Sequence, residues 1–240
     1  MLWATLDDCI ARAAPGVWIP QTPDGVPLVD TGVMADVLAL YPDLRMSYEE
    51  FLTLPREVHG DWIDGQVVLK GGQTRRHQEV LGLLMATVQC WLDAHDAGDS
   101  LFNFQMRAVP GGPGREVECL CLTHEHYRER VRFSYVDGPA DVVFEILSDS
   151  TRERDLEMRL EYARGGVPEY WMIDPERKWA EVCRLTGEGT YETVCDGRSG
   201  VLGSEFFPGL WFRTEWLLNE PRPRMDTVFH EWGLLRGAAA

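Results

Sequence analysis

A short apolar segment with two acids, residues 140–148 (ADVVFEILS), constrains the fold of this chain most. Apart from Asp141 and Glu145 it is almost entirely apolar up to residue 147, which is typical of a strand that is buried on both faces. A buried carboxylate is costly unless a cation, a metal or a proton accompanies it. The segment therefore predicts an interior strand in which Glu145 is either paired or functional.

The composition fits a globular domain. The chain has 240 residues, 45% of them hydrophobic, which is enough for one sizeable buried core. No apolar run approaches the length of about 18 residues that a membrane span needs, and the start of the sequence does not have the pattern of a signal peptide. None of the six cysteines forms a CxxC pair, so we expect Cys119 and Cys121 to be core residues of a reduced, cytoplasmic protein.

The charge is strongly acidic. A formal net charge of −16 disfavours a general nucleic-acid binder, because duplex binding depends largely on neutralising phosphates. A local basic surface is still compatible with this charge. The only lysines are Lys70 and Lys178, and every other basic residue of the 23 is arginine.

The order of the predicted elements indicates an α/β or α+β domain: a mixed central β-sheet flanked by helices. We expect an N-terminal extension over residues 1–45, a core domain over 46–194 and a C-terminal tail over 195–240 that packs on the core. The segment 124–138 is polar and is expected to be partly irregular, and the tail has no regular pattern. The expected elements of the core are a short helix in 46–55, a hairpin at 61–70, a helix at 75–98, strands at 101–109, 115–123 and 140–148, a helix after 149 that ends near 166, and strands at 169–174, 179–185 and 190–194.

Several segments together resemble a known family. The long match is GPADVVFEILSDSTRERD…EYARGGVPEYWMIDP, and DWIDGQVV, the His-Gln of RRHQEVLG, FQMR and GRE precede it in the family's order. Over roughly residues 46–217 the chain resembles the large bacterial family of "putative restriction endonucleases" (Uma-two type), part of the PD-(D/E)XK nuclease superfamily. The resemblance implies a restriction-endonuclease-like core in which acids on two neighbouring strands hold a divalent metal. It also implies a nearby lysine, displaced in this family to the following helix.

The family pattern is only partly kept. The second acid matches Glu145, and the first acid, an aspartate in the family, matches Glu118. The position of the lysine falls on Arg159 or Met158, depending on which flanking motif is used for counting. Neither residue is a lysine.

Helix geometry favours Arg159 over Met158. Leu156, Leu160 and Ala163 predict an apolar stripe on this helix. At 100° per residue Arg159 lies about 60° from the centre of that stripe, while Met158 lies roughly opposite. We therefore expect Arg159 to reach the site.

The resemblance and the residues together define a candidate site. Glu118, Glu145 and the backbone carbonyl of Ile146 are the predicted ligands of Mg²⁺ or Mn²⁺, and Glu118, Glu145, Arg159 and His77 form the predicted catalytic set. Arginine stays protonated, so Arg159 could stabilise phosphate charge but not act as a general base. Asp141 shares the face of Glu145 but lies roughly 13 Å away along the strand, which makes it a poor partner.

Other roles remain open for each of these residues. Glu145 could form a structural ion pair with Arg152 or Arg159, Glu118 could be an exposed strand residue, and Arg159 a surface charge. His77 projects towards the apolar face of its helix and could be a core histidine. The pair His124 and His126 is interpreted as surface residues rather than metal ligands.

Two functions follow from these observations. The first is a divalent-metal-dependent DNA endonuclease that hydrolyses phosphodiester bonds, expected to be a homodimer because two cuts on a duplex favour two sites. The alternative is a catalytically impaired pseudonuclease, a binding or regulatory protein, which the missing lysine and the acidic charge favour. The acid kept at Glu145, whose burial a metal would offset, favours the enzyme.

Overall fold

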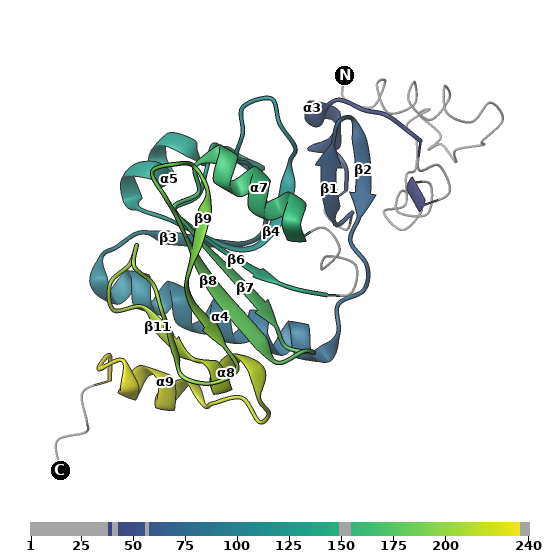
Figure 1. The fold of residues 1–240 in the computed structure, drawn as a ribbon. Coiled ribbons are helices and arrows are strands. Elements are labelled where there is room, and N and C mark those ends of the chain that lie inside the picture. Colours follow the sequence, from purple (N-terminus) through teal and green to yellow (C-terminus); the bar gives the residue numbers. More distant parts are fainter. Residues whose placement is uncertain (1–37, 40–42, 56–57, 149–154, 236–240) are drawn as a thin grey trace, which may run out of the picture. The chain divides into compact units, whose positions relative to one another are not determined.

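The computed structural model describes residues 38–39, 43–55, 58–148 and 155–235 (Figure 1). The chain divides into two units, residues 1–71 with 112–116, and residues 72–111 with 117–240. The extension expected over residues 1–45 lies almost wholly outside the described residues. The expected boundaries of the core domain and the tail stay a prediction.

The first unit contains a short helix and the predicted hairpin. Helix α3 (Tyr48–Phe51) begins with a capping box between Ser47 and Glu50. Strands β1 (Gly60–Ile63) and β2 (Gln66–Leu69) pair antiparallel. The turn between them, Asp64-Gly65, has positive φ at both residues (50° and 86°), which is the backbone that the Asp-Gly pair predicted.

The second unit is built around a seven-stranded mixed sheet with the strand order β5-β3-β4-β6-β7-β8-β9. Pairing is parallel for β3 with β5 and for β6 with β7, and antiparallel for β4 with β6, β7 with β8 and β8 with β9. The central strand β6 is buried along its whole length, as its apolar sequence predicted. The strands are β3 (Asp99–Arg107), β4 (Arg115–Leu122), β5 (Tyr135–Asp137), β6 (Val142–Ile146), β7 (Glu169–Asp174), β8 (Trp179–Leu185) and β9 (Tyr191–Gly197).

Two helices cover opposite faces of this sheet (Figure 1). Helix α4 (Arg75–His95), capped by Thr74, packs on the face that contains Phe144 and Trp171. Helix α7 (Asp155–Gly165) packs on the other face, which contains Val143. The α+β architecture with a mixed central sheet between helices is therefore confirmed.

The predicted inner face of α7 was wrong. Leu156 and Leu160 are exposed, at 67% and 58%, whereas Met158 and Tyr162 are buried against the sheet. Apolar residues on this short helix alternate with charged ones, so its sequence offers two competing stripes. The stripe with the large Tyr162 ring buries more area, and its phenol finds a hydrogen-bond acceptor inside. Arg159 lies between the two buried positions and still reaches inward.

Two segments expected to lack regular structure contain short elements. Residues after Thr123 form helix α5, and the tail adds a hairpin and two helices that pack against the α4 face of the sheet. Elements of three to seven residues are too short to show a period, and aromatic packing stabilises those of the tail. They are α5 (His124–Arg130), β10 (Val201–Gly203), β11 (Trp211–Arg213), α8 (Thr214–Leu218) and α9 (Met225–Glu231). Among the helices of the described residues, none is both long and apolar enough to span a membrane.

Candidate active site

Glu118 and Glu145 lie opposite each other on neighbouring strands. The register of β4 and β6 pairs Cys119 with Phe144 and Leu120 with Val143, and one step further along the same register places Glu118 against Glu145. Side chains of directly opposite residues share one face, with Cβ atoms about 5 Å apart. Both glutamates are buried, at 2% and 4% exposure. An exposed Glu118, one of the alternatives from sequence, is therefore wrong.

The pKa of the neighbouring Cys119 thiol is affected by both carboxylates. Burial is the main cause that raises the pKa of Cys119, and Cys121 adds to it. The negative charges of Glu118 and Glu145 raise the pKa of this thiol further. Two buried carboxylates this close repel each other when both are ionised, and either a bound cation or a shared proton relieves that repulsion.

Tyr162 positions the carboxylate of Glu145. Its hydroxyl donates to Glu145 Oε1 at 2.8 Å, and the whole tyrosine is buried. The ring is held by an edge-on contact with Tyr170, with centroids 5.3 Å apart. Ile146 ends β6, and its side chain packs in the core on the α4 face, so only its backbone carbonyl could contribute to a metal site.

His77 and Gln73 position the carboxylate of Glu118. His77 Nε2 lies 3.3 Å from Glu118 Oε1, and Gln73 Nε2 lies 3.4 Å from the same oxygen. His77 is held in the first turn of α4, where its backbone N–H donates to the capping Thr74 hydroxyl. Its ring is 3% exposed, and Nδ1 has no hydrogen-bond partner among the described residues. His77 is thus a buried histidine that contacts the candidate site.

Arg159 lies on the same face as Glu145, displaced along a row of cross-strand partners. Met172 is the β7 partner of Glu145, and Glu181 is the β8 partner of Met172. Arg159 Nη1 lies 3.9 Å from Met172 Sδ and donates to Glu181 Oε2 at 3.1 Å. Its side chain is 26% exposed, so Arg159 is a partly buried, ion-paired residue, and its role in the site stays a prediction. Arg152, the other partner considered for Glu145, lies outside the described residues.

The family model described as "Putative restriction endonuclease" (Uma2) matches residues 48–215. The chain belongs to this family. The solved structures include a crystal structure of a putative nuclease belonging to DUF820 from Anabaena variabilis, which is similar to this chain with a TM-score of 0.59 at 17% identity. The similarity covers 72% of this chain and 97% of that one, and at this identity it shows the fold. No curated protein matches the chain significantly.

The candidate site of this Uma2 chain fits a Mg²⁺-like ion rather than a closed metal cage. Among the described residues, no three His, Cys, Asp or Glu side chains gather as a metal-binding group. Mg²⁺ is usually held by one or two carboxylates, with water and substrate phosphate as the other ligands. Glu118 and Glu145 match that mode, and they do not match the four-ligand pattern of structural zinc.

The remaining acids and histidines of this region have structural partners. Asp141 is buried and accepts from the backbone N–H of Thr123 at 2.8 Å, and His126 Nδ1 lies 2.6 Å from its other oxygen. His124 is 44% exposed and lies within 3.2 Å of Asp96 and Asp99. His124 and His126 lie in α5, which follows the C-terminal end of β4. Glu118 lies four residues before that end.

Three contributors were missed from sequence: Gln73, Tyr162 and Glu181. Tyr162 follows Arg159 by three residues, so both lie on one side of α7, but the incorrect stripe hid this relation. Glu181 is an acid inside the apolar strand WAEVCRL, the same kind of signal as Glu145. Gln73 lies in the loop before α4, and no pattern in that loop marks it as a site residue.

Proposed function

We propose that this protein is a DNA endonuclease that uses Mg²⁺ or Mn²⁺ to hydrolyse phosphodiester bonds. The observation that supports this most is the buried pair of Glu118 and Glu145 on facing strands in a chain of the Uma2 family. Burying two like charges side by side costs several kcal/mol, and a bound divalent cation offsets that cost.

Each side chain of the site has a role in this proposal. Glu118 and Glu145 hold the ion, together with the carbonyl of Ile146, while Tyr162 and His77 fix the orientation of the two carboxylates. When bound, the ion supplies an activated water and neutralises charge on the phosphate. Arg159, which reaches Glu181 on β8, contributes positive charge beside the site. It does not act as the general base, because guanidinium stays protonated, so the proton of the attacking water passes to solvent.

The pseudonuclease alternative has one observation in its favour. Of the two positions that the resemblance gives for the family's lysine, Arg159 is the one expected to reach the site, and it forms an ion pair with Glu181, which reduces the charge it can offer to a phosphate. A homodimer, with one site for each strand of a duplex, belongs to the endonuclease proposal.

The test is cleavage of supercoiled plasmid by the purified chain in Mn²⁺, Mg²⁺ or EDTA, beside two matched variants. Glu145→Gln keeps the size and burial of the side chain and removes its charge. Glu169→Gln is the control, since Glu169 is an equally buried strand carboxylate that accepts from Trp171 Nε1 and from two backbone N–H groups. We expect metal-dependent nicking by the wild type and Glu169→Gln, and none by Glu145→Gln.

Two outcomes contradict the proposal. Equal nicking by all three proteins would assign the activity to a contaminant or to another site. No nicking by the wild type in either metal would leave the pseudonuclease as the better reading, and analytical ultracentrifugation of the same samples would test the dimer.

A further inference from the structure

A pocket of about 310 Å³ opens beside the first turn of α4. Its lining comes from α4, from the turn between β7 and β8, and from the end of α8 with the loop after it, three segments that are distant in sequence. The lining residues are Arg76, Lys178, Leu218, Asn219 and Glu220. In a chain with a net charge of −16, two cations in one small pocket call for an explanation.

The loop wall of this pocket is fixed by charge-assisted contacts. Glu220 accepts from Arg75 Nη2 and Arg76 Nε at 3.0 and 2.9 Å. Arg222, with only 12% of its side chain exposed, donates to the backbone carbonyls of Leu217 and Asn219 at 2.6 and 3.0 Å. These contacts neutralise Glu220 and hold the loop against α4, so the pocket is preformed.

The positive charge of Lys178 is not balanced by an ion pair within the described residues. Within the described residues its ammonium has neither an ion-pair nor a hydrogen-bond partner, whereas Arg76 is paired with Glu176 at 3.0 Å. Lys178 also adopts φ of 53°, in the left-handed region that glycine or asparagine fills at less cost. A lysine at a strained turn position is unusual, which favours a role for its side chain.

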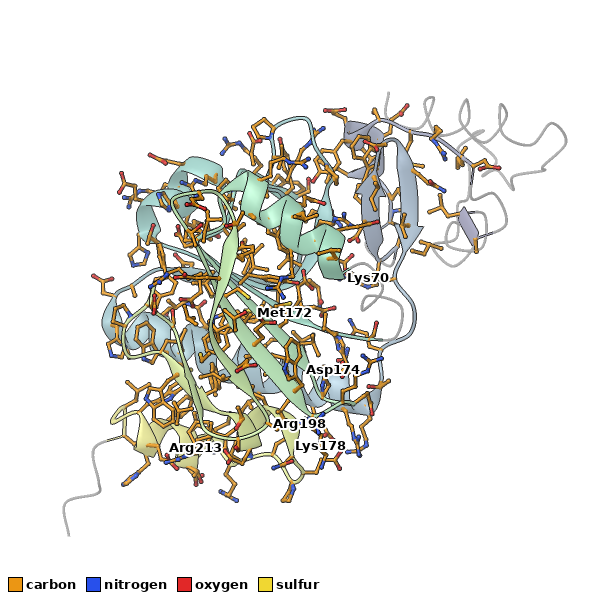
Figure 2. All side chains as sticks on the ribbon, viewed as in Figure 1. Lys70, Met172, Asp174, Lys178, Arg198 and Arg213 are labelled. Carbon is orange, nitrogen blue, oxygen red and sulfur yellow. The ribbon has the colours of Figure 1, made fainter. Side chains whose placement is uncertain are left out.

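The pocket lies at the end of the sheet that carries the candidate site. Glu145 is one residue from the end of β6, which is parallel to β7, and Lys178 lies in the turn directly after β7. Figure 2 shows Met172, Asp174 and Lys178 in succession towards this end. From Met172, the partner of Glu145, two residues of strand cover roughly 7 Å, so the turn begins about two to three nucleotide spacings from Glu145. On the helix side Arg76 directly precedes His77, which contacts Glu118.

We propose that this pocket binds a backbone phosphate of the nucleic acid next to the scissile bond, an inference that rests on the proposed nuclease function. Lys178 provides the net charge, and the side-chain amide of Asn219 can donate to phosphate oxygens. Arg76 lies at the rim of the pocket, where Glu176 and Glu220 balance its charge. It can orient a phosphate through hydrogen bonds, but it adds no net positive charge. Such a contact fixes the register of a strand without reading its sequence.

The experiment measures binding without cleavage, so that it is independent of nuclease activity. A fluorescein-labelled duplex is titrated with the full chain in EDTA, from about 50 to 200 mM salt, and followed by anisotropy. Lys178→Asn suits the left-handed backbone and removes the charge, and Lys178→Arg keeps the charge. The control is Arg128→Gln, which removes an exposed cation on α5, at the other end of the sheet.

We expect Lys178→Asn to weaken duplex binding several-fold at the lowest salt and to lower the slope of log K against log [salt] by about 0.9, while Lys178→Arg and Arg128→Gln bind like the wild type. Equal behaviour of Lys178→Asn and Arg128→Gln would overturn the proposal, and so would a wild type that does not bind the duplex. A second arm adds inorganic phosphate at matched ionic strength. If Lys178→Asn lost binding of inorganic phosphate but bound the duplex like the wild type, the proposal would be overturned. The pocket would then be a site for free phosphate.

Discussion

Replacing Tyr162 with phenylalanine removes one hydroxyl from the candidate site and leaves the ring in place. The ring is buried and packs on Tyr170, and phenylalanine keeps that packing. The lost group is the donor to Glu145 Oε1 at 2.8 Å. The variant thus tests whether the orientation of this carboxylate matters for metal binding.

The expected effect has two parts. A hydrogen bond to a charged group contributes about 1.5–3 kcal/mol, so the free energy of unfolding in EDTA should fall by that amount. Loss of a partner that orients a metal ligand typically weakens metal binding by roughly 10- to 100-fold. Plasmid nicking at limiting Mn²⁺ should fall by a similar factor and recover in part at saturating Mn²⁺.

The matched control is Tyr191→Phe. The Tyr191 hydroxyl donates to the backbone carbonyl of Val167 at 2.8 Å, so this variant loses a hydrogen bond between neutral groups in the same core. It should cost about 1 kcal/mol of stability and leave Mn²⁺ affinity unchanged. Calorimetric titration of Mn²⁺ and denaturant unfolding of the three proteins separate the two effects. Equal Mn²⁺ affinities for Tyr162→Phe and Tyr191→Phe would refute the reasoning that Tyr162 positions a ligand.

Three further predictions concern neighbouring groups. Arg159→Ala should destabilise the protein by about 2 kcal/mol in urea unfolding, below the range for fully buried pairs, because Glu181 loses its positively charged partner and keeps only neutral donors. Arg159→Lys should keep the nicking activity in the plasmid assay. His126→Ala should cost about 1–3 kcal/mol in urea unfolding, because buried Asp141 loses a partner, with no change in Mn²⁺ affinity by calorimetry. Burial raises the pKa of Cys183 from 9.0 to about 12, so its contribution to stability is complete below pH 9 and is lost as the pH rises towards 12. Cys183→Ala should flatten the fall in stability over that interval in denaturation curves recorded at each pH.

The parts of the fold that the sequence predicted are those in which one local pattern dominates. The apolar strand around Glu145 was expected at 140–148 and is observed at 142–146, and the long helix expected at 75–98 runs from 75 to 95. In both cases burial and backbone propensity favour the same structure. Glu145 was found because a carboxylate is conspicuous in an apolar strand.

The misses share a physical cause, which is that the deciding interaction lies outside the segment. The sequence of α7 contains two apolar stripes, and the sheet on which the helix packs determines which of them is buried. The hydrogen bond from Tyr162 to Glu145 joins residues 17 positions apart, and the contact of Gln73 with Glu118 joins residues 45 apart. Pairings of this kind depend on the sheet register, which no single strand sequence contains.

For the proposed nuclease function, the net charge of −16 makes the position of unpaired cations decisive for binding to DNA. Several arginines of the described region are already paired with carboxylates, such as Arg184 with Glu192 and Glu205, and Arg213 with Glu231. A paired arginine releases few counterions when it meets a phosphate, because its charge is already balanced. Duplex affinity measured in EDTA should therefore have a shallow salt dependence, with a slope of log K against log [salt] that corresponds to about one to three phosphates rather than the 6–10 of a typical specific binder. A steep slope in the anisotropy titration would contradict this reasoning, because it would require more unpaired cations at the DNA-binding surface than Lys178 and its neighbours provide.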